Sequence, residues 1–240
     1  RQILSKKQIL WQIFFTGFEA IPLVFMVAML FGTVIVQLVL NVMPTVGFGD
    51  LFGEVMVIVI VREFGPLLTA FLVAGRTGAG LATYIGNMTV YSEVDALRSL
   101  GIDPIRFLTM PAIIGGTVSV LILSLLFNAI AIGAGFIFTQ IAIHFFSLNI
   151  EIGWVIFREN IFNAMTVNDL IMMVIKPLTF GMIISTISCY QGLRLGNDVR
   201  EVPQAASSTI VQSYVLIVIA NVIISALFIS QYLKTLPGLL

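Results

Sequence analysis

Five long runs of apolar residues dominate the pattern of hydrophobic and polar positions along the chain. Each run is close to or above the roughly 20 residues that a helix needs to cross the hydrocarbon core of a bilayer. The runs are continuously apolar rather than alternating, which favours helical spans over the strands of a membrane barrel. The sequence therefore predicts an all-α integral membrane protein whose five transmembrane helices cover about 20–41, 54–75, 112–138, 170–190 and 209–231. The second is expected to continue as helix to about residue 86, so that it covers 54–86 in all.

Residues 1–18 follow a different pattern, which predicts an amphipathic helix at the membrane surface. On a helical wheel the apolar side chains, among them Trp11 and Phe14, gather on one side, and polar ones such as Gln12 and Thr16 gather on the other. A helix of this kind lies among the lipid headgroups with its apolar face toward the acyl chains. A disordered tail leading into the first span is the alternative.

The low charge of the chain excludes several classes of function. Of its 240 residues, 59% are hydrophobic and only 10% are charged, whereas a soluble domain carries about a quarter charged residues. A water-soluble enzyme and a disordered chain are therefore both excluded. Twelve Lys and Arg balance twelve Asp and Glu, which leaves no basic excess for binding nucleic acid. A single cysteine, Cys189, and a single histidine, His144, cannot form a disulfide framework or a Cys- or His-based metal cluster.

The basic residues predict the orientation of the chain through the positive-inside rule. Eight of the twelve precede the first span or lie in the loops after the second and fourth spans: Arg1, Lys6, Lys7, Arg76, Arg98, Arg106, Arg194 and Arg200. The opposite side receives only Arg158, Lys176 and Lys234. We therefore expect a cytoplasmic N-terminus and a C-terminus on the outer side. Because the chain begins at Arg1 rather than at a methionine, we also expect further residues upstream.

The segment between the second and third spans carries start and stop signals for a short helix. Ser92 is a good N-cap, and Asp95 three residues later completes a capping-box pattern. Gly101 suits the left-handed position that follows a helix, and Pro104 prevents the helix from continuing. The pattern predicts a helix over 92–101.

A helix of this length is not stable alone in water. Val94, Leu97 and Leu100 would share one of its faces, so they must pack against another surface. A loop between membrane spans offers little core of its own, which favours docking of a soluble partner. A helix folded back on the membrane surface is the alternative.

Four motifs, which occur in the expected order, resemble those of the MlaE/YrbE permease family. They are Arg62-Glu63-Phe64-Gly65-Pro66, Ala74-Gly75-Arg76-Thr77-Gly78-Ala79-Gly80, Glu93-Val94-Asp95-Ala96-Leu97 with Gly101-Ile102-Asp103-Pro104, and Cys189-Tyr190-Gln191-Gly192-Leu193-Arg194. The similarity covers about residues 10–232. Proteins of that family are the membrane subunits of ABC transporters that move phospholipids together with MCE-domain proteins.

The resemblance implies a homodimer of five-span subunits in the inner membrane of a Gram-negative bacterium, with an MCE-domain protein on the periplasmic side. It also implies that a separate ATPase docks on residues 92–103. Since the chain contains no Gly-x-x-x-x-Gly-Lys-Ser/Thr motif, we expect ATP and Mg²⁺ to bind to that partner and this chain to carry no cofactor. The residues assigned to ATPase coupling are Glu93, Asp95, Ala96, Leu97, Arg98, Gly101 and Asp103, and a second cytoplasmic turn contributes Gln191 and Arg194.

Arg62 and Glu63 fall inside the second span, where ionisable groups are costly and are usually paired or functional. Consecutive residues on a helix point about 100° apart, so we expect each to find its own partner on another helix or on the other protomer. The alternative is that they line or gate the substrate cavity, or relay a proton or an ion in a secondary transporter. The amide of Asn128 in the third span is expected to form a hydrogen bond between helices.

Small residues recur every four positions at Ala74, Gly78, Ala82 and Gly86. A stripe of this kind lets another membrane helix approach closely. We therefore predict that this face of the second span packs against a neighbouring helix.

Residues 45–50 reproduce the signature string of a potassium-channel filter. A filter needs a short re-entrant helix before it and an outer span before that helix, whereas here 20–41 forms a complete span and Pro44 interrupts the approach. We interpret 45–50 as an external turn, and an ion channel stays as an alternative function.

The side chains available to line a cavity are mainly Leu, Ile, Val, Phe and Met, which suit acyl chains. By resemblance, the cavity lies at the dimer interface and is formed mainly by the first, second and fifth spans. Helical spacing alone selects candidate lipid contacts on the first span: Leu23, Val27, Leu30 and Gln37.

Overall fold

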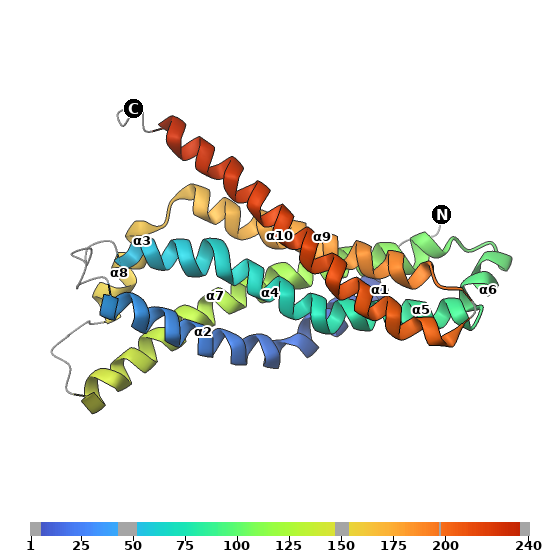
Figure 1. Cartoon of the computed structure of the whole chain (residues 1–240), viewed down its shortest axis with the longest axis horizontal. Helices are drawn as coiled ribbons and strands as arrows, with labels where there is room; N and C mark the ends of the chain where they lie inside the picture. Colours follow the sequence, from blue (N-terminus) through green and yellow to red (C-terminus); the bar gives the residue numbers. More distant parts are fainter. Residues whose placement is uncertain (1–5, 43–51, 147–153, 197, 236–240) are drawn as a thin grey trace. The chain divides into compact units, whose positions relative to one another are not determined.

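The computed structural model describes residues 6–42, 52–146, 154–196 and 198–235, and every element within these ranges is helical. Five helical stretches are long and apolar enough to cross a membrane, and a separate short helix begins the chain (Figure 1). The predicted all-α membrane protein with five spans is therefore confirmed. The turn expected at 45–50 lies outside the described residues.

The α-helices in these ranges are, in chain order, α1 (Lys6–Gly17), α2 (Ile21–Val42), α3 (Phe52–Met56), α4 (Gly65–Val73), α5 (Ala79–Val90), α6 (Glu93–Ser99), α7 (Met110–Phe146), α8 (Trp154–Ala164), α9 (Val167–Leu193) and α10 (Val202–Thr235). Two short 3-10 segments, η1 (Phe18–Ala20) and η7 (Val199–Glu201), precede α2 and α10. Three π-helical segments, η4 (Val57–Phe64), η5 (Ala74–Gly78) and η6 (Ile105–Thr109), interrupt the second span and begin the third.

The third span and the segment after it contain more helix than the sequence pattern indicates. α7 continues eight residues beyond the expected end at 138, and α8 lies between the third and fourth spans, where the sequence pattern predicts no membrane span. In α8 the apolar side chains of Phe157 and Ile161, one turn apart, are both buried. Tertiary packing of this one apolar stripe therefore stabilises a helix that is too short to be evident from hydrophobicity.

The contacts divide the chain into two compact units. The first unit comprises 1–20, 70–122 and 176–240, and the second comprises 21–69 and 123–175. The long helices α7 and α9 contribute residues to both units.

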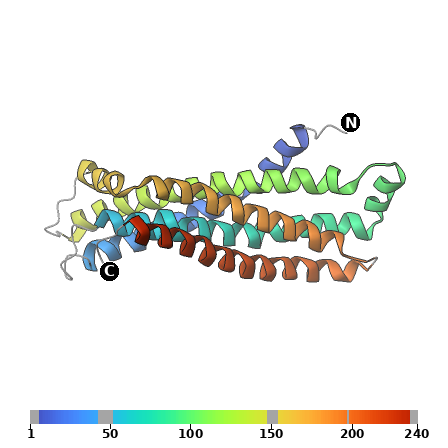
Figure 2. The same cartoon turned by 90° about the horizontal axis from the view of Figure 1, so that it is seen from above.

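In the first unit, α5 lies beside α10, and the predicted stripe of small residues is buried (Figure 2). A Cβ atom at Gly86 would lie 2.7 Å from Cδ1 of Leu195, and one at Gly78 would lie 3.1 Å from Cγ2 of Ile184. The absence of side chains at these glycines is what permits the close approach of the neighbouring segments. The stripe thus has the packing role predicted for it.

In the second unit, α2 and α7 make backbone contact through glycine. A Cβ atom at Gly32 would lie 2.0 Å from the carbonyl oxygen of Ala131, and one at Gly135 would lie 2.1 Å from Cγ2 of Val36. The two helices approach each other so closely that any side chain at either glycine would collide with the opposite helix. Van der Waals packing of this kind holds helices together where the lipid removes the hydrophobic driving force.

We predict that Gly32→Ala destabilises the protein by forcing the backbones of α2 and α7 apart. The loss of packing is expected to cost about 1–3 kcal/mol, which corresponds to a fall of several degrees in the melting temperature. Thermal unfolding in detergent measures the effect. The matched control is Gly133→Ala, because a Cβ atom at Gly133 in α7 meets nothing within 4 Å. Equal melting temperatures for the two variants would contradict the tight crossing.

Candidate functional site

The loop helix α6 ends in a Schellman motif at the predicted stop signal. Gly101 has the left-handed backbone angle φ of +74°. Its N–H donates to the carbonyl of Arg98 at 2.9 Å, and the N–H of Ile102 donates to the carbonyl of Leu97 at 2.9 Å. These two bonds satisfy the last carbonyls of the helix, and the termination predicted at Gly101 is confirmed.

The capping interaction predicted for the start of this helix is wrong. Ser92 adopts a left-handed conformation (φ 59°, ψ 17°) and its side chain forms no capping hydrogen bond, so there is no capping box with Asp95. The backbone N–H of Ser92 instead donates to the carbonyl of Thr89, which continues the tight turn after α5. Because α5 and α6 are only two residues apart, the turn that joins them dictates the conformation of Ser92.

The three apolar side chains assigned to one face of α6 differ in their surroundings. Val94 is buried, Leu97 is half-buried, and Leu100 is 75% exposed because the helix ends at Ser99. α6 packs against α5, so it has its own support within the first unit. The loop therefore exposes Leu100 while Val94 anchors the helix.

Charged groups surround the exposed part of this loop. Glu93, Asp95 and Arg98 are exposed, as is Ala96, and Arg98 Nη1 lies 3.0 Å from Asp95 Oδ1. Asp103 Oδ1 accepts a hydrogen bond from the N–H of Ile105 at 3.0 Å and thereby caps the π segment η6. All of these groups remain available to water or to a docking protein.

The second predicted turn lies at the same end of the first unit as α6 (Figures 1 and 2). Arg194 is exposed there, but Gln191 is buried and its Nε2 donates to Oε1 of Gln212 on α10 at 2.8 Å. Gln191 therefore joins α9 to α10 rather than forming part of an exposed docking surface.

The intramembrane residue Arg62 pairs with Asp169 at the beginning of α9. Arg62 Nε donates to Asp169 Oδ1 at 2.8 Å, and Nη2 donates to the same oxygen. The side chain of Asp169 is 1% exposed and that of Arg62 is 15% exposed. The expectation that Arg62 finds its partner on another helix is confirmed. Its neighbour Glu63 is half-buried in the same π segment.

Asp169 is a residue that the sequence analysis missed. Its second carboxylate oxygen accepts hydrogen bonds from the backbone N–H of Thr166 at 2.9 Å and from the Thr166 hydroxyl at 2.7 Å. Thr166 and Asp169 form the capping box of α9, so one carboxylate both caps a helix and neutralises an intramembrane guanidinium. The pattern Thr-x-x-Asp directly before an apolar run was the signal that could have identified it.

The prediction that Lys176 is an external basic residue is wrong. Lys176 lies inside α9, its side chain is fully buried, and its Nζ donates to Oγ of Ser225 on α10 at 2.8 Å. Its long apolar stem allows burial among helices, and the polar contact stabilises the buried ammonium group.

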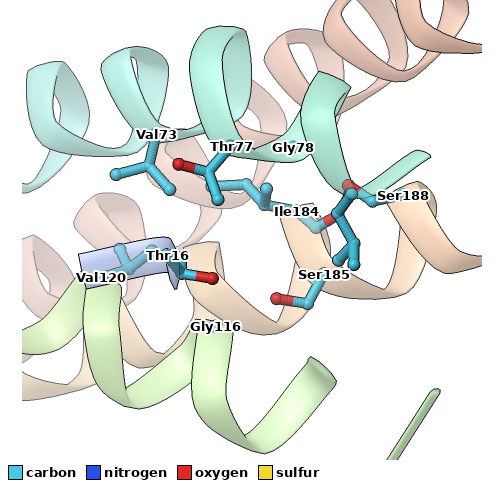
Figure 3. A pocket seen from close by; sticks show the side chains of 10 residues that line it. Thr16, Val73, Thr77, Gly78, Gly116, Val120, Ile184, Ser185 and Ser188 are labelled. Atoms are coloured by element: carbon cyan, nitrogen blue, oxygen red, sulfur yellow. Dashed lines mark hydrogen bonds between the residues drawn. The ribbon is translucent and has the colours of Figure 1, made fainter. Parts of the chain in front are cut away.

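A small cavity lies among the helices of the first unit (Figure 3). Its volume of about 10 Å³ corresponds to a single water molecule, and the hydroxyls of Thr16 and Ser185 point into it. The cavity is far too small for a lipid or for a sugar. Among the described residues, no group of three or more His, Cys, Asp or Glu side chains is arranged to hold a metal ion.

The four candidate lipid contacts on α2 do not form one exposed face. Leu30 is 64% exposed, whereas Leu23, Val27 and Gln37 are half-buried. The side of α2 that is most open consists of other apolar residues, which helical spacing alone did not select: Phe25, Met26, Val34 and Leu38.

Comparison with known proteins gives a consistent picture over most of the chain. Residues 9–227 match the family model described as Permease MlaE. A probable ABC transporter permease protein from Rickettsia prowazekii is 34% identical over 225 residues, which is 92% of this chain and 82% of the relative. A probable ABC transporter permease protein from Synechocystis is 29% identical over 92% of this chain and 82% of its own length. The chloroplastic protein trigalactosyldiacylglycerol 1 from Arabidopsis thaliana is 31% identical over 76% of this chain and 50% of its own length.

We predict that Asp169→Asn strongly destabilises the protein, because it leaves the largely buried Arg62 guanidinium without its counter-charge. The amide is close in shape to the capping carboxylate, so the lost charge is the main change. Breaking a buried pair on one side costs about 3–5 kcal/mol, whereas removing both charges can be nearly neutral. The double variant Arg62→Met/Asp169→Asn is therefore expected to recover most of the loss. Unfolding by SDS titration measures both, and losses that simply add would show that the two charges are not coupled.

Proposed function

The chain belongs to the MlaE permease family and is a membrane permease subunit, and we propose that its substrate is a phospholipid. Two copies would enclose the lipid, and a separate ATPase would drive its movement. The observation that carries it is the uneven covering of the five spans.

The first and fifth spans are the least covered by the rest of the chain. Within the most apolar part of each span, 22% of the first and 11% of the fifth is buried, compared with 44% of each of the other three. The open side of α10 is apolar over most of its length, with exposed side chains at Val211, Val215, Ile219, Val222 and Leu227. Apolar helix faces of this extent fit acyl chains and a second copy of the chain, and they offer no recognition for a soluble polar substrate.

The relatives also support a lipid substrate. The Arabidopsis relative carries the name of a galactolipid, trigalactosyldiacylglycerol. The headgroup of our proposed substrate would differ from a galactolipid, but the diacylglycerol portion is common to both classes. An apolar cavity between two copies would recognise that common portion.

In this proposal α6 receives the movement of the ATPase. Leu100 and the charged groups around it would contact the ATPase, while Val94 passes the displacement to α5. The turn after α9 would respond in parallel, because Gln191 connects α9 to α10. Movement of the second, third and fifth spans would then narrow the lipid cavity. ATP and Mg²⁺ would bind only to the partner.

The orientation follows from the basic residues. Because Lys176 lies within a span, the side opposite the N-terminus keeps Arg158 and Lys234, which strengthens the asymmetry of charge. We propose that the chain lies in a bacterial inner membrane with α6 and the N-terminus in the cytoplasm. The C-terminus would lie in the periplasm, where an MCE-domain protein would exchange lipid with the cavity.

We predict that Asp95→Ala/Leu100→Ala uncouples the ATPase from transport. Both side chains are exposed, so the variant is expected to reach the membrane at the normal level. Lipid transfer in reconstituted vesicles should fall at least about tenfold while ATP hydrolysis continues. The control, Glu159→Ala/Phe162→Ala, changes two exposed residues of α8 that have the same chemistry. Normal coupling in the first variant would contradict the docking role of α6.

We also predict that the chain, purified from its native membrane in mild detergent, brings a Walker-motif ATPase, an MCE-domain protein and about one phospholipid per dimer with it. Mass spectrometry of the proteins and of the extracted lipids measures all three. Recovery of the chain without an ATPase and without lipid would overturn the proposed function, and ion flux through the purified chain would then be the next measurement.

A further inference from the structure

Three polar side chains at the crossing of α4 and α7, in the second unit, have no hydrogen-bond partner within the part of the chain that the structure describes. Thr69 and Ser124 are fully buried and Asn128 is 2% exposed. Neither hydroxyl oxygen, nor either polar atom of the Asn128 amide, has a hydrogen-bond partner among the described residues. The expectation that the Asn128 amide bonds directly to another helix is therefore wrong.

The positions of these residues place them at one crossing. A Cβ atom at Gly65 would lie only 1.8 Å from Oδ1 of Asn128, so the amide rests directly against the backbone of α4. Thr69 follows Gly65 by one helical turn, and Ser124 precedes Asn128 by one turn. The second and third spans run in opposite directions (Figures 1 and 2), so one turn after Gly65 and one turn before Asn128 fall at the same level of the two helices.

Several other hydroxyls in the spans bond to their own helix, although Thr109 and Ser213 also lack a hydrogen-bond partner among the described residues. Thr33, Thr83, Thr117 and Thr209 each donate to the carbonyl four residues earlier, at 2.7, 2.9, 2.6 and 2.8 Å. Thr69 and Ser124 do not form this bond.

We infer that this crossing binds an ordered water molecule. Each hydroxyl and the amide can both donate and accept, and a buried water typically makes two to four hydrogen bonds to polar groups that otherwise lack partners. The three side chains carry no charge, so they suit water rather than a phosphate or a carboxylate. The second and third spans are then joined at this level through water instead of through direct side-chain bonds.

A density map of the full chain in lipid nanodiscs, at a resolution that shows ordered waters, tests the inference directly. We expect a peak within about 3.2 Å of polar atoms from at least two of the three residues. An empty crossing in such a map would overturn the inference, and so would direct hydrogen bonds among Thr69, Ser124 and Asn128.

The variant Thr69→Val gives a second test whose sign separates a hydrated crossing from a dry one. With water bound, the change removes one of its partners and is expected to lower the melting temperature by a few degrees. In a dry crossing the same change removes an unsatisfied hydroxyl and raises the melting temperature. The control is Thr209→Val, because Thr209 is equally buried but bonds to its own helix. A melting temperature for Thr69→Val above that of the unchanged protein would overturn the inference.

Discussion

The pairing of Arg62 with Asp169 connects the second span to the beginning of the fourth, inside a membrane domain where a lone charge would be costly. The carboxylate also closes the capping box with Thr166, so the start of α9 and the position of η4 depend on the same group. Arg62 and Glu63 both lie in the π segment, whose turns are wider than those of an α-helix. Segments of this kind occur frequently at functional sites. Because this ion pair joins the second and fourth spans, it constrains how those two spans pack.

Packing of the spans depends on glycine at a few places where backbones touch. At Gly32, Gly65 and Gly86 a Cβ atom would collide with a neighbouring segment, and each of these contacts joins helices that are distant in the sequence. Lipid tails are as apolar as the side chains they would replace, so close fit and polar contacts hold the helices together. Buried polar contacts such as Gln191 to Gln212 and Lys176 to Ser225 add to that fit at the fourth and fifth spans.

The distribution of exposed surface separates two roles within one chain. α6 is anchored by Val94 and ended by Gly101, so Leu100 and its charged neighbours occupy a preformed position at the end of the first unit. The first and fifth spans keep large apolar faces that their own chain does not cover. In the function proposed above, α6 would receive the movement of the ATPase and the open apolar spans would enclose the lipid.

Features that rest on local physical chemistry could be predicted from the order of the amino acids. Long apolar runs specify five spans because the bilayer demands about 20 such residues, and Gly101 specifies a helix end because it tolerates a positive φ. The stripe from Ala74 to Gly86 predicted close packing for the same local reason. Which polar groups meet, in contrast, depends on how the helices pack. The partner of Arg62, the burial of Lys176, the failed cap at Ser92 and the unpaired amide of Asn128 all depend on elements far apart in the chain or on a tight turn between helices. Hydrophobic periodicity carries no information about such pairings, because it reports the face of a helix and not the neighbour that the face will contact.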